Sequence, residues 1–565
     1  MNLDYVYMNK NRLEFPLDDS IYIMQDEGKK DFTCIVSNSD KVGADIFAPE
    51  IDFYINSSQD DINSKISAVK TLYDARMISY DMARYFDYEQ EIGNLLLVIS
   101  SGNPPIVSKL KEVNFKTILL ESEQISYIEG HLGELKVGVS INEDEVNEVK
   151  TDQIVWFNAP KHALLQSGIY DFSGLDEEEI VDRLKSKLGL YKYKNFISYN
   201  VDICQYHQRR EEICAQCAKV CPTVAITKDD ENRELIFSHI DCEGCGECVS
   251  VCPSGALDYT QMTHFAFSEV AKLYRDKVAL IIPRKMTKVL NSLNIKLPKG
   301  VLPFAIEGEK YLDETHFLTL LQESKSKIIF FTDLISPASS DAISILNQIY
   351  KVKYKRGAIT VATNEEELKT ALKEICFFEN SHYGIDEDGL KKREIFSARL
   401  SHLVGKDDFG VAKTGQNVHY GVVNIDKDRC TLCLSCVGAC NVGALSACEE
   451  DFSLRVNSSV CTTCKYCEFT CPEKCIEVIR GEIPLNSLWF STSIVAKDEM
   501  FECVVCGVPF ATKRSVEKIA NMMKPFFVND EVKTKTLYCC AQCKPKLMFQ
   551  EHIFNEQREI ENGKK

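Results

Sequence analysis

The chain has 565 residues, of which 45% are hydrophobic and 27% are charged, and its formal net charge at pH 7 is −18. The length predicts several domains, the composition excludes a wholly disordered chain, and the negative charge argues against binding nucleic acid or an anionic membrane surface. The N-terminus has no apolar signal segment and the longest apolar stretches are too short to span a bilayer, so we expect a cytoplasmic protein without a membrane span. Its 25 cysteines are then expected to bind metals rather than to form disulfides.

Residues 1–195 are expected to form an α/β domain. Apolar residues on one face predict a helix from Ile62 to Tyr80, and a strand at Leu95–Ser100 precedes a helix that starts after Pro104 and Pro105. Further strands are predicted at Thr117–Leu120, Leu135–Val139 and Gln153–Phe157. The order resembles half of a nucleotide-binding fold, but the first strand is followed by SSGNPP rather than by G-x-G-x-x-G. We therefore expect a scaffold or docking domain here, with a dinucleotide site as the weaker alternative.

The first dense group of cysteines lies in residues 196–261. Its second half has the spacing C-x₂-C-x₂-C-x₃-C-P, and its first half keeps this spacing from the second cysteine onward but has Glu211 where the first cysteine would stand. The cysteines are Cys204, Cys214, Cys217 and Cys221 in the first half, and Cys242, Cys245, Cys248 and Cys252 in the second. We interpret Cys204 as the first cysteine displaced by an inserted loop, with His207 or a three-cysteine cluster as alternatives.

Such runs bind two [4Fe–4S] clusters in bacterial ferredoxins, where the fourth cysteine of each run ligates the cluster of the other run. The exchange predicts two ligand sets in this segment. The first cluster takes Cys204, Cys214, Cys217 and Cys252, and the second takes Cys242, Cys245, Cys248 and Cys221. Gly244 and Gly246 leave room for backbone N–H groups to approach the sulfurs.

Residues 262–404 alternate strand and helix patterns, which predicts a small parallel sheet of flavodoxin-like type. The predicted strands are Val278–Ile282, Lys327–Thr332 and Ala358–Ala362, and the predicted helices are Asp313–Leu321, Asp341–Tyr350 and Glu365–Ile375. The segment contains no phosphate loop, nucleophile elbow or metal cluster. Asp333 and Asn364 follow strands, and we interpret them as turn and N-cap residues rather than as ligand-binding residues. Residues 405–420 are expected to be a linker.

The second ferredoxin-like module is predicted at residues 421–482, where the cysteine run occurs twice more. Asn441 replaces the proline of one run, but the spacing of the cysteines is intact in both. The third cluster is assigned to Cys430, Cys433, Cys436 and Cys471, and the fourth to Cys461, Cys464, Cys467 and Cys440. A strand, a binding loop and a short helix are thus expected four times, grouped two and two.

Two C-x₂-C pairs in residues 498–555 predict a Cys₄ zinc site. They are Cys503 with Cys506 and Cys540 with Cys543, and an amphipathic helix through Val516, Ile519, Met523 and Phe526 separates them. A rubredoxin-like iron or a further cluster is the alternative, and only Cys540, not Cys539, gives the x₂ spacing. Residues 556–565 are expected to be a frayed tail. The cysteines left unassigned are Cys34, Cys376, Cys448, Cys475 and Cys539, of which Cys34, Cys376 and Cys475 are interpreted as packing thiols.

These segments predict an α+β multidomain chain in which two bacterial ferredoxin-like 2[4Fe–4S] modules alternate with parallel-sheet α/β domains, followed by a zinc ribbon-like domain. Four stretches carry a resemblance to a known family: YNVDICQYHQRREEICAQCAKVCPTVAI, VLPFAIEGEKYLDETHFLTLLQES, CTLCLSCVGAC and FECVVCGVPFATKRSVEKI. With them the chain resembles the large 4Fe–4S-binding proteins encoded beside bacterial formate dehydrogenases. The resemblance covers roughly the C-terminal two-thirds of the chain and supports the cofactors more than a particular reaction.

The motifs predict an electron carrier with four [4Fe–4S] clusters and one zinc ion, which relays electrons to or from a cytoplasmic oxidoreductase such as formate dehydrogenase. We expect no catalytic residues and no enzyme activity of the chain on its own, because the sequence has no flavin, nicotinamide or molybdenum motif. Two alternatives remain: an accessory factor for maturation of a redox enzyme, with structural or sensing clusters, and a flavin- or nucleotide-dependent enzyme that uses an α/β domain.

Overall fold

The computed structural model describes residues 2–9, 13–25, 33–102, 104–142, 145–528 and 530–561. The chain divides into two compact units, Met1–Arg399 and Leu400–Lys565, and each is described by itself. Both units mix helices with strands, and the first contains three parallel sheets. Within the described residues, no helix is both long and apolar enough to cross a membrane.

A buried, fully parallel sheet of four strands forms the centre of the first unit, with the order β19-β18-β20-β21. The strands are β18 (Val278–Pro283), β19 (Val301–Ile306), β20 (Ile328–Phe331) and β21 (Ile359–Ala362). The sheet is parallel, as the sequence predicts, and in order of sequence it is 2-1-3-4, the order with which flavodoxin-like sheets begin. The sequence reasoning missed β19, which contains Pro303. This proline is tolerated because β19 is an edge strand and needs no ladder hydrogen bond on its outer side.

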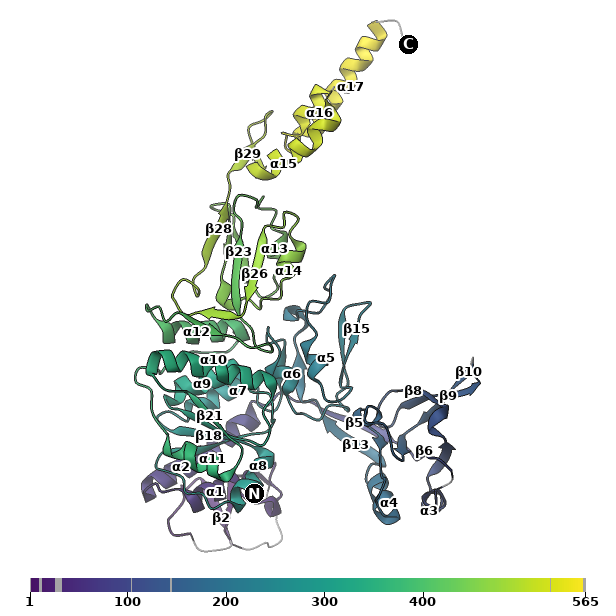
Figure 1. Cartoon of the computed structure of the whole chain (residues 1–565), viewed down its shortest axis with the longest axis vertical. Helices are drawn as coiled ribbons and strands as arrows, with labels where there is room; N and C mark the ends of the chain where they lie inside the picture. Colours follow the sequence, from purple (N-terminus) through teal and green to yellow (C-terminus); the bar gives the residue numbers. More distant parts are fainter. Residues whose placement is uncertain are drawn as a thin grey trace. The chain divides into compact units, whose positions relative to one another are not determined.

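Helices cover both faces of this sheet. They are α7 (His264–Lys272), α8 (Arg284–Ser292), α9 (Glu314–Ser324), α10 (Pro337–Tyr354) and α11 (Glu365–Lys373), and α12 (Lys392–Val404) follows them in the chain. Figure 1 shows α9 and α10 on one side of the sheet and α8 and α11 on the other. The three predicted helices correspond to α9, α10 and α11, and Asp313 and Asn364 are the side-chain N-caps of α9 and α11.

The expected domain at residues 1–195 is divided between two sheets. The first sheet has the order β2-β1-β3-β4 and is again fully parallel. Its elements are β1 (Asn2–Met8), β2 (Ile21–Met24), β3 (Thr33–Ser37), β4 (Ile46–Phe47), α1 (Glu50–Ser57) and α2 (Ile62–Asp81). The helices α1 and α2 pack against β19, α7 and α8, so this part of the chain shares a core with the flavodoxin-like sheet rather than with residues 95–185.

The second sheet has the order β12-β11-β6-β7 and is also parallel. Its elements are β6 (Leu95–Ile99), β7 (Lys116–Leu120), β11 (Gln153–Trp156), β12 (Ile169–Tyr170), α3 (Ile106–Glu112) and α4 (Glu177–Lys185). An antiparallel sheet of β8 (Ile125–Glu129), β9 (Leu135–Asn142) and β10 (Glu145–Thr151) covers one face. The paired strands β5 (Asp87–Ile92) and β13 (Gly189–Lys194) connect this body to the first cysteine-rich segment.

The two cysteine-rich segments have the same architecture. In the first, β14 (Ile197–Tyr199) pairs with β17 (Leu257–Tyr259), β15 (Ile226–Asp229) pairs with β16 (Glu234–Phe237), and the helices are α5 (Gln216–Val220) and α6 (Glu247–Ser250). In the second, β23 (Gly421–Ile425) pairs with β26 (Ile476–Arg480), β24 (Leu445–Cys448) pairs with β25 (Ser453–Val456), and the helices are α13 (Ser435–Ala439) and α14 (Tyr466–Thr470). Each half thus supplies a strand, a loop and a short helix, as the repeated motif predicts.

Residues 405–420 are not only a linker, because they contain β22 (Val411–Lys413), which pairs with β27 (Glu482–Pro484). Ala412 and Tyr420 are buried there, which explains why the segment is ordered against the module. A further strand, β28 (Ser493–Lys497), joins β25. The C-terminal part consists of β29 (Met500–Glu502), β30 (Pro509–Thr512), α15 (Lys513–Met523), α16 (Glu531–Thr536) and α17 (Cys543–Glu561), so the expected tail is helical as far as residue 561.

An ion pair between buried side chains joins the N-terminal sheet to the flavodoxin-like sheet. Arg76 on α2 is 4% exposed, and its guanidinium lies 2.6 Å from a carboxylate oxygen of Glu50 and 2.7 Å from one of Glu307. Replacing Arg76 by methionine keeps much of its volume but leaves Glu50 buried without its cation. We expect Arg76→Met to lower the free energy of unfolding of this part of the chain by about 3 kcal/mol.

Urea denaturation of the first unit's helical signal measures this effect. Arg183→Met is the matched control, because Arg183 forms an exposed i,i+4 pair with Glu179 and its loss is expected to cost less than about 0.5 kcal/mol. Equal stabilities of the two variants would contradict the assigned role of Arg76.

Candidate iron–sulfur and metal centres

The first module contains two small cavities, each lined by four cysteines. One has Cys204, Cys214, Cys217 and Cys252 in its wall, and the other has Cys221, Cys242, Cys245 and Cys248. The helix α5 separates them, since it carries Cys217 at one end and is followed by Cys221. His207 is not among the residues that line the first cavity.

Backbone N–H groups in the cysteine loops point at the sulfurs. The amide of Tyr206 lies 3.4 Å from Cys204 Sγ, and the amide of Thr463 lies 3.2 Å from Cys461 Sγ. In both cases the donor is two residues after the cysteine. The same relation holds for Cys214 with Gln216, Cys242 with Gly244, Cys245 with Glu247 and Cys430 with Leu432. Donors of this kind stabilise thiolates and the negative charge of an iron–sulfur cluster.

The loops reach this geometry through left-handed backbone conformations, most of them at residues other than glycine. The residues with positive φ beside these cysteines are Ala215, Gly244, Gly246, Leu432, Leu434, Thr463 and Lys465. A left-handed conformation costs a residue with a Cβ about 1–2 kcal/mol. Such strain persists where the surroundings require it, and here it recurs at equivalent places in the loops, which marks them as binding loops.

The sulfurs of each predicted set are electrostatic neighbours. Burial raises the pKa of Cys217, and repulsion from the other three sulfurs of its set raises it further. The pKa of Cys436 is raised to about 12, first by burial and then by the other three sulfurs of its set. The same causes raise the pKa of Cys248 and of Cys467. Four thiolates at close range in a largely buried setting need a cation to neutralise them, so the donor set fits an iron–sulfur cluster at each of these places.

Cys475 lies beside the third set. Its Sγ is 3.6 Å from Cys471 Sγ, and both side chains are buried in the same core as Cys430. The sequence assigns Cys475 to packing because small residues occupy this position in the other repeats. The structure therefore places a fifth sulfur next to the predicted third cluster, a neighbour that the spacing of the motif does not reveal.

The flavodoxin-like domain supplies cations to the first module. Lys392 Nζ lies 3.0 Å from the carbonyl oxygen of Cys252, and Arg393 Nε lies 2.8 Å from that of Pro253. The side chain of Lys310 lies near Cys245 and lowers its pKa, against the larger effect of burial, which raises it. Sequence reasoning missed these residues because they stand far along the chain in segments without a cysteine motif.

Each of the two cysteine-rich modules matches a known protein family. Residues 213–256 and residues 422–472 each match a family described as a 4Fe-4S dicluster domain. The chain therefore contains two 4Fe–4S dicluster domains, which supports an iron–sulfur electron-transfer role. No curated protein matches the chain.

Four further cysteine sulfurs gather in the C-terminal part. Those of Cys503, Cys506, Cys540 and Cys543 lie within 4.8 Å of one another. Cys539 is fully buried beside Cys503 but is not one of the four clustered sulfurs, and its Sγ donates to the carbonyl oxygen of Lys535. Burial acts to raise the pKa of Cys503, but N–H groups of Cys540, Cys506 and Val505 outweigh it and lower this pKa to about 6. The geometry is that of a closed Cys₄ metal site.

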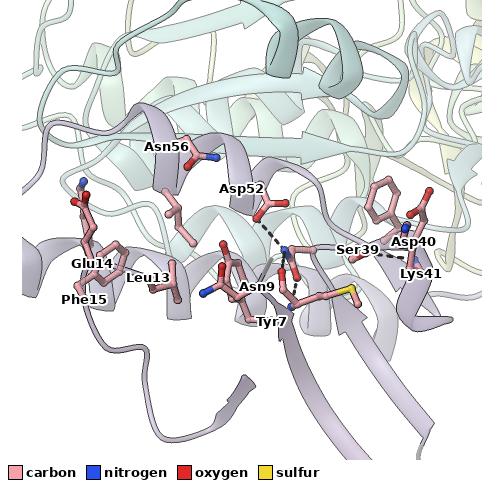
Figure 2. A pocket seen from close by; sticks show the side chains of 15 residues that line it. Tyr7, Asn9, Leu13, Glu14, Phe15, Ser39, Asp40, Lys41, Asp52 and Asn56 are labelled. Atoms are coloured by element: carbon pink, nitrogen blue, oxygen red, sulfur yellow. Dashed lines mark hydrogen bonds between the residues drawn. The ribbon is translucent and has the colours of Figure 1, made fainter. Parts of the chain in front are cut away.

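The N-terminal sheet carries a polar cavity of about 660 Å³ beyond the ends of β1 and β3. This is the point at which the strand order reverses, where open α/β sheets commonly bind ligands. Figure 2 shows Asp52 and Asn56 of α1 facing Tyr7 and Asn9 across it. The amide of Asn38 lies in this wall and already bonds to the backbone of Met8 and to Asp52. The sequence reasoning placed its candidate nucleotide site in the other sheet and did not find this cavity.

Gly246 tests the importance of the loop geometry in the first module. Its φ is +82°, and a Cβ at this position would lie 2.5 Å from Cβ and 3.1 Å from the backbone N of Tyr311. Gly246→Ala must therefore displace the loop that carries Cys245 and Cys248. We expect this variant to lose at least half of the iron of the first module, measured by iron analysis of anaerobically purified protein.

Gly102→Ala is the matched control, because Gly102 has a similar φ of +89° but a Cβ added there would meet no atom within 4 Å. Both substitutions carry the same kind of backbone strain, so only the contact with Tyr311 separates them. Full iron content in Gly246→Ala would show that the close approach is not needed for binding.

Proposed function

We propose that this chain is a polyferredoxin: it relays electrons through four [4Fe–4S] clusters, two in each dicluster domain, to or from an oxidoreductase. The observation that carries the proposal is that four cysteines line each of the two cavities of the first module. In the second module, the sulfurs of each predicted set likewise lie close enough to raise the pKa of a cysteine of that set. The ligands are Cys204, Cys214, Cys217 and Cys252; Cys242, Cys245, Cys248 and Cys221; Cys430, Cys433, Cys436 and Cys471; and Cys461, Cys464, Cys467 and Cys440.

The short separation of the two sites in one module supports transfer between them. Cys217 and Cys221 belong to different sites and stand four residues apart on and after α5, a rise of about 6 Å. Cys248 of the second site is also an electrostatic neighbour of Cys217 in the first, and Cys436 is one of Cys467. Clusters this close exchange electrons more readily with each other than with distant acceptors.

The partner is proposed to be a cytoplasmic oxidoreductase that presents a basic face. The net charge of −18 supports such electrostatic docking, since charges of opposite sign steer two redox proteins together. Formate dehydrogenase is the candidate partner that the sequence resemblance indicates.

We also propose zinc for the C-terminal Cys₄ site, with a structural role. Zinc prefers four thiolates in a closed tetrahedral site, and closed sites leave no position for a substrate. The domain that holds the site contacts the third cluster loop: Thr512 Oγ1 and Ser515 Oγ donate to the carbonyl oxygen of Thr431 at 3.0 and 2.7 Å. The zinc domain then stabilises the loop that carries Cys430 and Cys433.

An EPR-monitored redox titration of anaerobically purified protein tests the relay. We expect about sixteen irons per chain and reducible clusters that show spin coupling within each module, because the paired sites are close. Clusters that are present but stay oxidised at every accessible potential would overturn the relay and favour an accessory role in the maturation of a redox enzyme.

The assignment of Cys204 gives a sharper prediction. We expect Cys204→Ala to lose the EPR signal of an intact first cluster, because Cys204 lines the first cavity, whereas His207→Ala should keep it. EPR of the two reduced variants measures the difference. The reverse pattern would assign the ligand to His207.

At the C-terminal site, the adjacent residues Cys539 and Cys540 provide a matched pair of variants, one at a proposed ligand and one at its neighbour. We expect Cys540→Ser to lose the zinc ion and Cys539→Ser to retain it, because only the sulfur of Cys540 joins the other three. Metal analysis by mass spectrometry gives the zinc content of each variant. Zinc retained in Cys540→Ser, or iron found in place of zinc in the unaltered protein, would contradict the assignment.

A further inference from the structure

A buried histidine and a half-buried one meet at the wall of a second large cavity in the first unit. His264 begins α7, and His316 lies in the first turn of α9. Their ring centroids are 4.4 Å apart, and both rings line a cavity of about 500 Å³. A ring nitrogen of each and a carboxylate oxygen of Asp313 lie within 4.8 Å of one another.

A carboxylate lies beside Nδ1 of each imidazole, and hydrogen bonds are missing at Nε2 of His316 and at both ring nitrogens of His264 among the described residues. His316 Nδ1 lies 2.8 Å from Asp313 Oδ1, and His264 Nδ1 lies 3.1 Å from Glu387 Oε2. His316 is 1% exposed, yet its Nε2 has no hydrogen-bond partner among the described residues, and neither has Nε2 of His264. A buried ring nitrogen without a partner is costly, and a cation bound beside the rings and the Asp313 carboxylate would satisfy the ring nitrogen that faces it.

The charges around the histidines favour a cation. Three carboxylates stand close to the rings: Asp258, Asp313 and Glu387. The buried cations that pair with them are Lys392, which contacts Asp313 and Glu314, and Arg399, which contacts Glu387 and is shared with Glu323. Asp258 accepts backbone N–H groups from Tyr259 and His264. Arg84 and Lys391 also line the cavity, but the side chains directly beside the two rings are carboxylates, which suit a divalent ion better than an anion.

This cavity adjoins the site of the first cluster. Tyr199, Ala256 and Leu257 line both this cavity and the cavity of Cys204, Cys214, Cys217 and Cys252. A ligand in the larger cavity is thus separated from the cysteine site by the thickness of these side chains.

We propose that His264, His316 and Asp313 bind a divalent transition-metal ion that faces this cavity. Two imidazoles and one carboxylate suit zinc, manganese or ferrous iron, and three protein ligands leave positions open to a small ligand from the cavity. This site is distinct from the cysteine sites, and it gives the chain a place where a metal-bound ligand lies next to the first cluster.

Zinc binding to the full, cluster-containing protein tests the site. The protein is first depleted of loosely held metal by mild anaerobic chelation, with iron counted before and after, and is then equilibrated with Zn²⁺. We expect two zinc ions per chain in the unaltered protein and one in His264→Phe and in His316→Gln. A variant with Cys540→Ser should also bind one, and X-ray absorption of that ion should show nitrogen and oxygen ligands with imidazole scattering. His162→Gln is the control, because His162 is exposed and is not among the residues that line the cavity, and it should keep both ions.

The position of the proposed metal site beside the first cluster is tested with Mn²⁺, which binds thiolates weakly and oxygen and nitrogen ligands better. In the reduced protein, Mn²⁺ at the proposed site should speed the spin relaxation of the first cluster, and His316→Gln should abolish this effect. His264→Phe keeps an aromatic ring in the core, so it decides the question if His316→Gln fails to fold. The proposal is overturned if the unaltered protein binds only the C-terminal zinc ion, or if both histidine variants still bind two. In either case the histidines act only as ion-pair partners of Glu387 and Asp313.

Discussion

Cysteine sulfurs occupy the centre of each small module, where other proteins of this size would place aliphatic side chains. In the second module, five of the fifteen residues of the buried core are cysteines: Cys430, Cys436, Cys461, Cys471 and Cys475. Burial and mutual repulsion raise the pKa values of several of these thiols, so the assembled thiolates require a cationic iron core. Modules this small have little other apolar surface to bury, and cluster binding then supplies much of their stability.

In the first unit, residues outside the first module hold its cysteine loops in place. Tyr311 packs against Gly246 beside Cys245, and Lys392 holds the carbonyl of Cys252, so the flavodoxin-like domain contacts a loop of each of the two cysteine sites of the first module. Arg76 then joins the N-terminal sheet to the same core. If the proposed histidine site binds metal, the domain that supports the first cluster also places a ligand-binding cavity beside it.

Periodicity and motif spacing predicted the parts that depend on local sequence. The strands at Leu95 and Val278, the helix from Ile62 and the repeated cysteine loops all follow from patterns that a single segment carries. The edge strand with Pro303 and the strand β22 in the expected linker were missed, because tertiary pairing stabilises them against their local signals. The contact of His264 with His316 could not be predicted, because it depends on how α7 packs against α9. Cys475 stands only four residues after Cys471, and the sequence did not show whether its sulfur would point toward that of Cys471.

Mössbauer spectroscopy of protein produced with ⁵⁷Fe tests the presence of four cubane clusters most directly, because it counts iron by cluster type. We expect about sixteen irons per chain to appear as [4Fe–4S]²⁺ in the oxidised protein, in four clusters, and reduction to convert them within intact cubanes. A spectrum dominated by mononuclear thiolate-bound iron, or by half this number of irons in cubanes, would contradict the four-cluster relay.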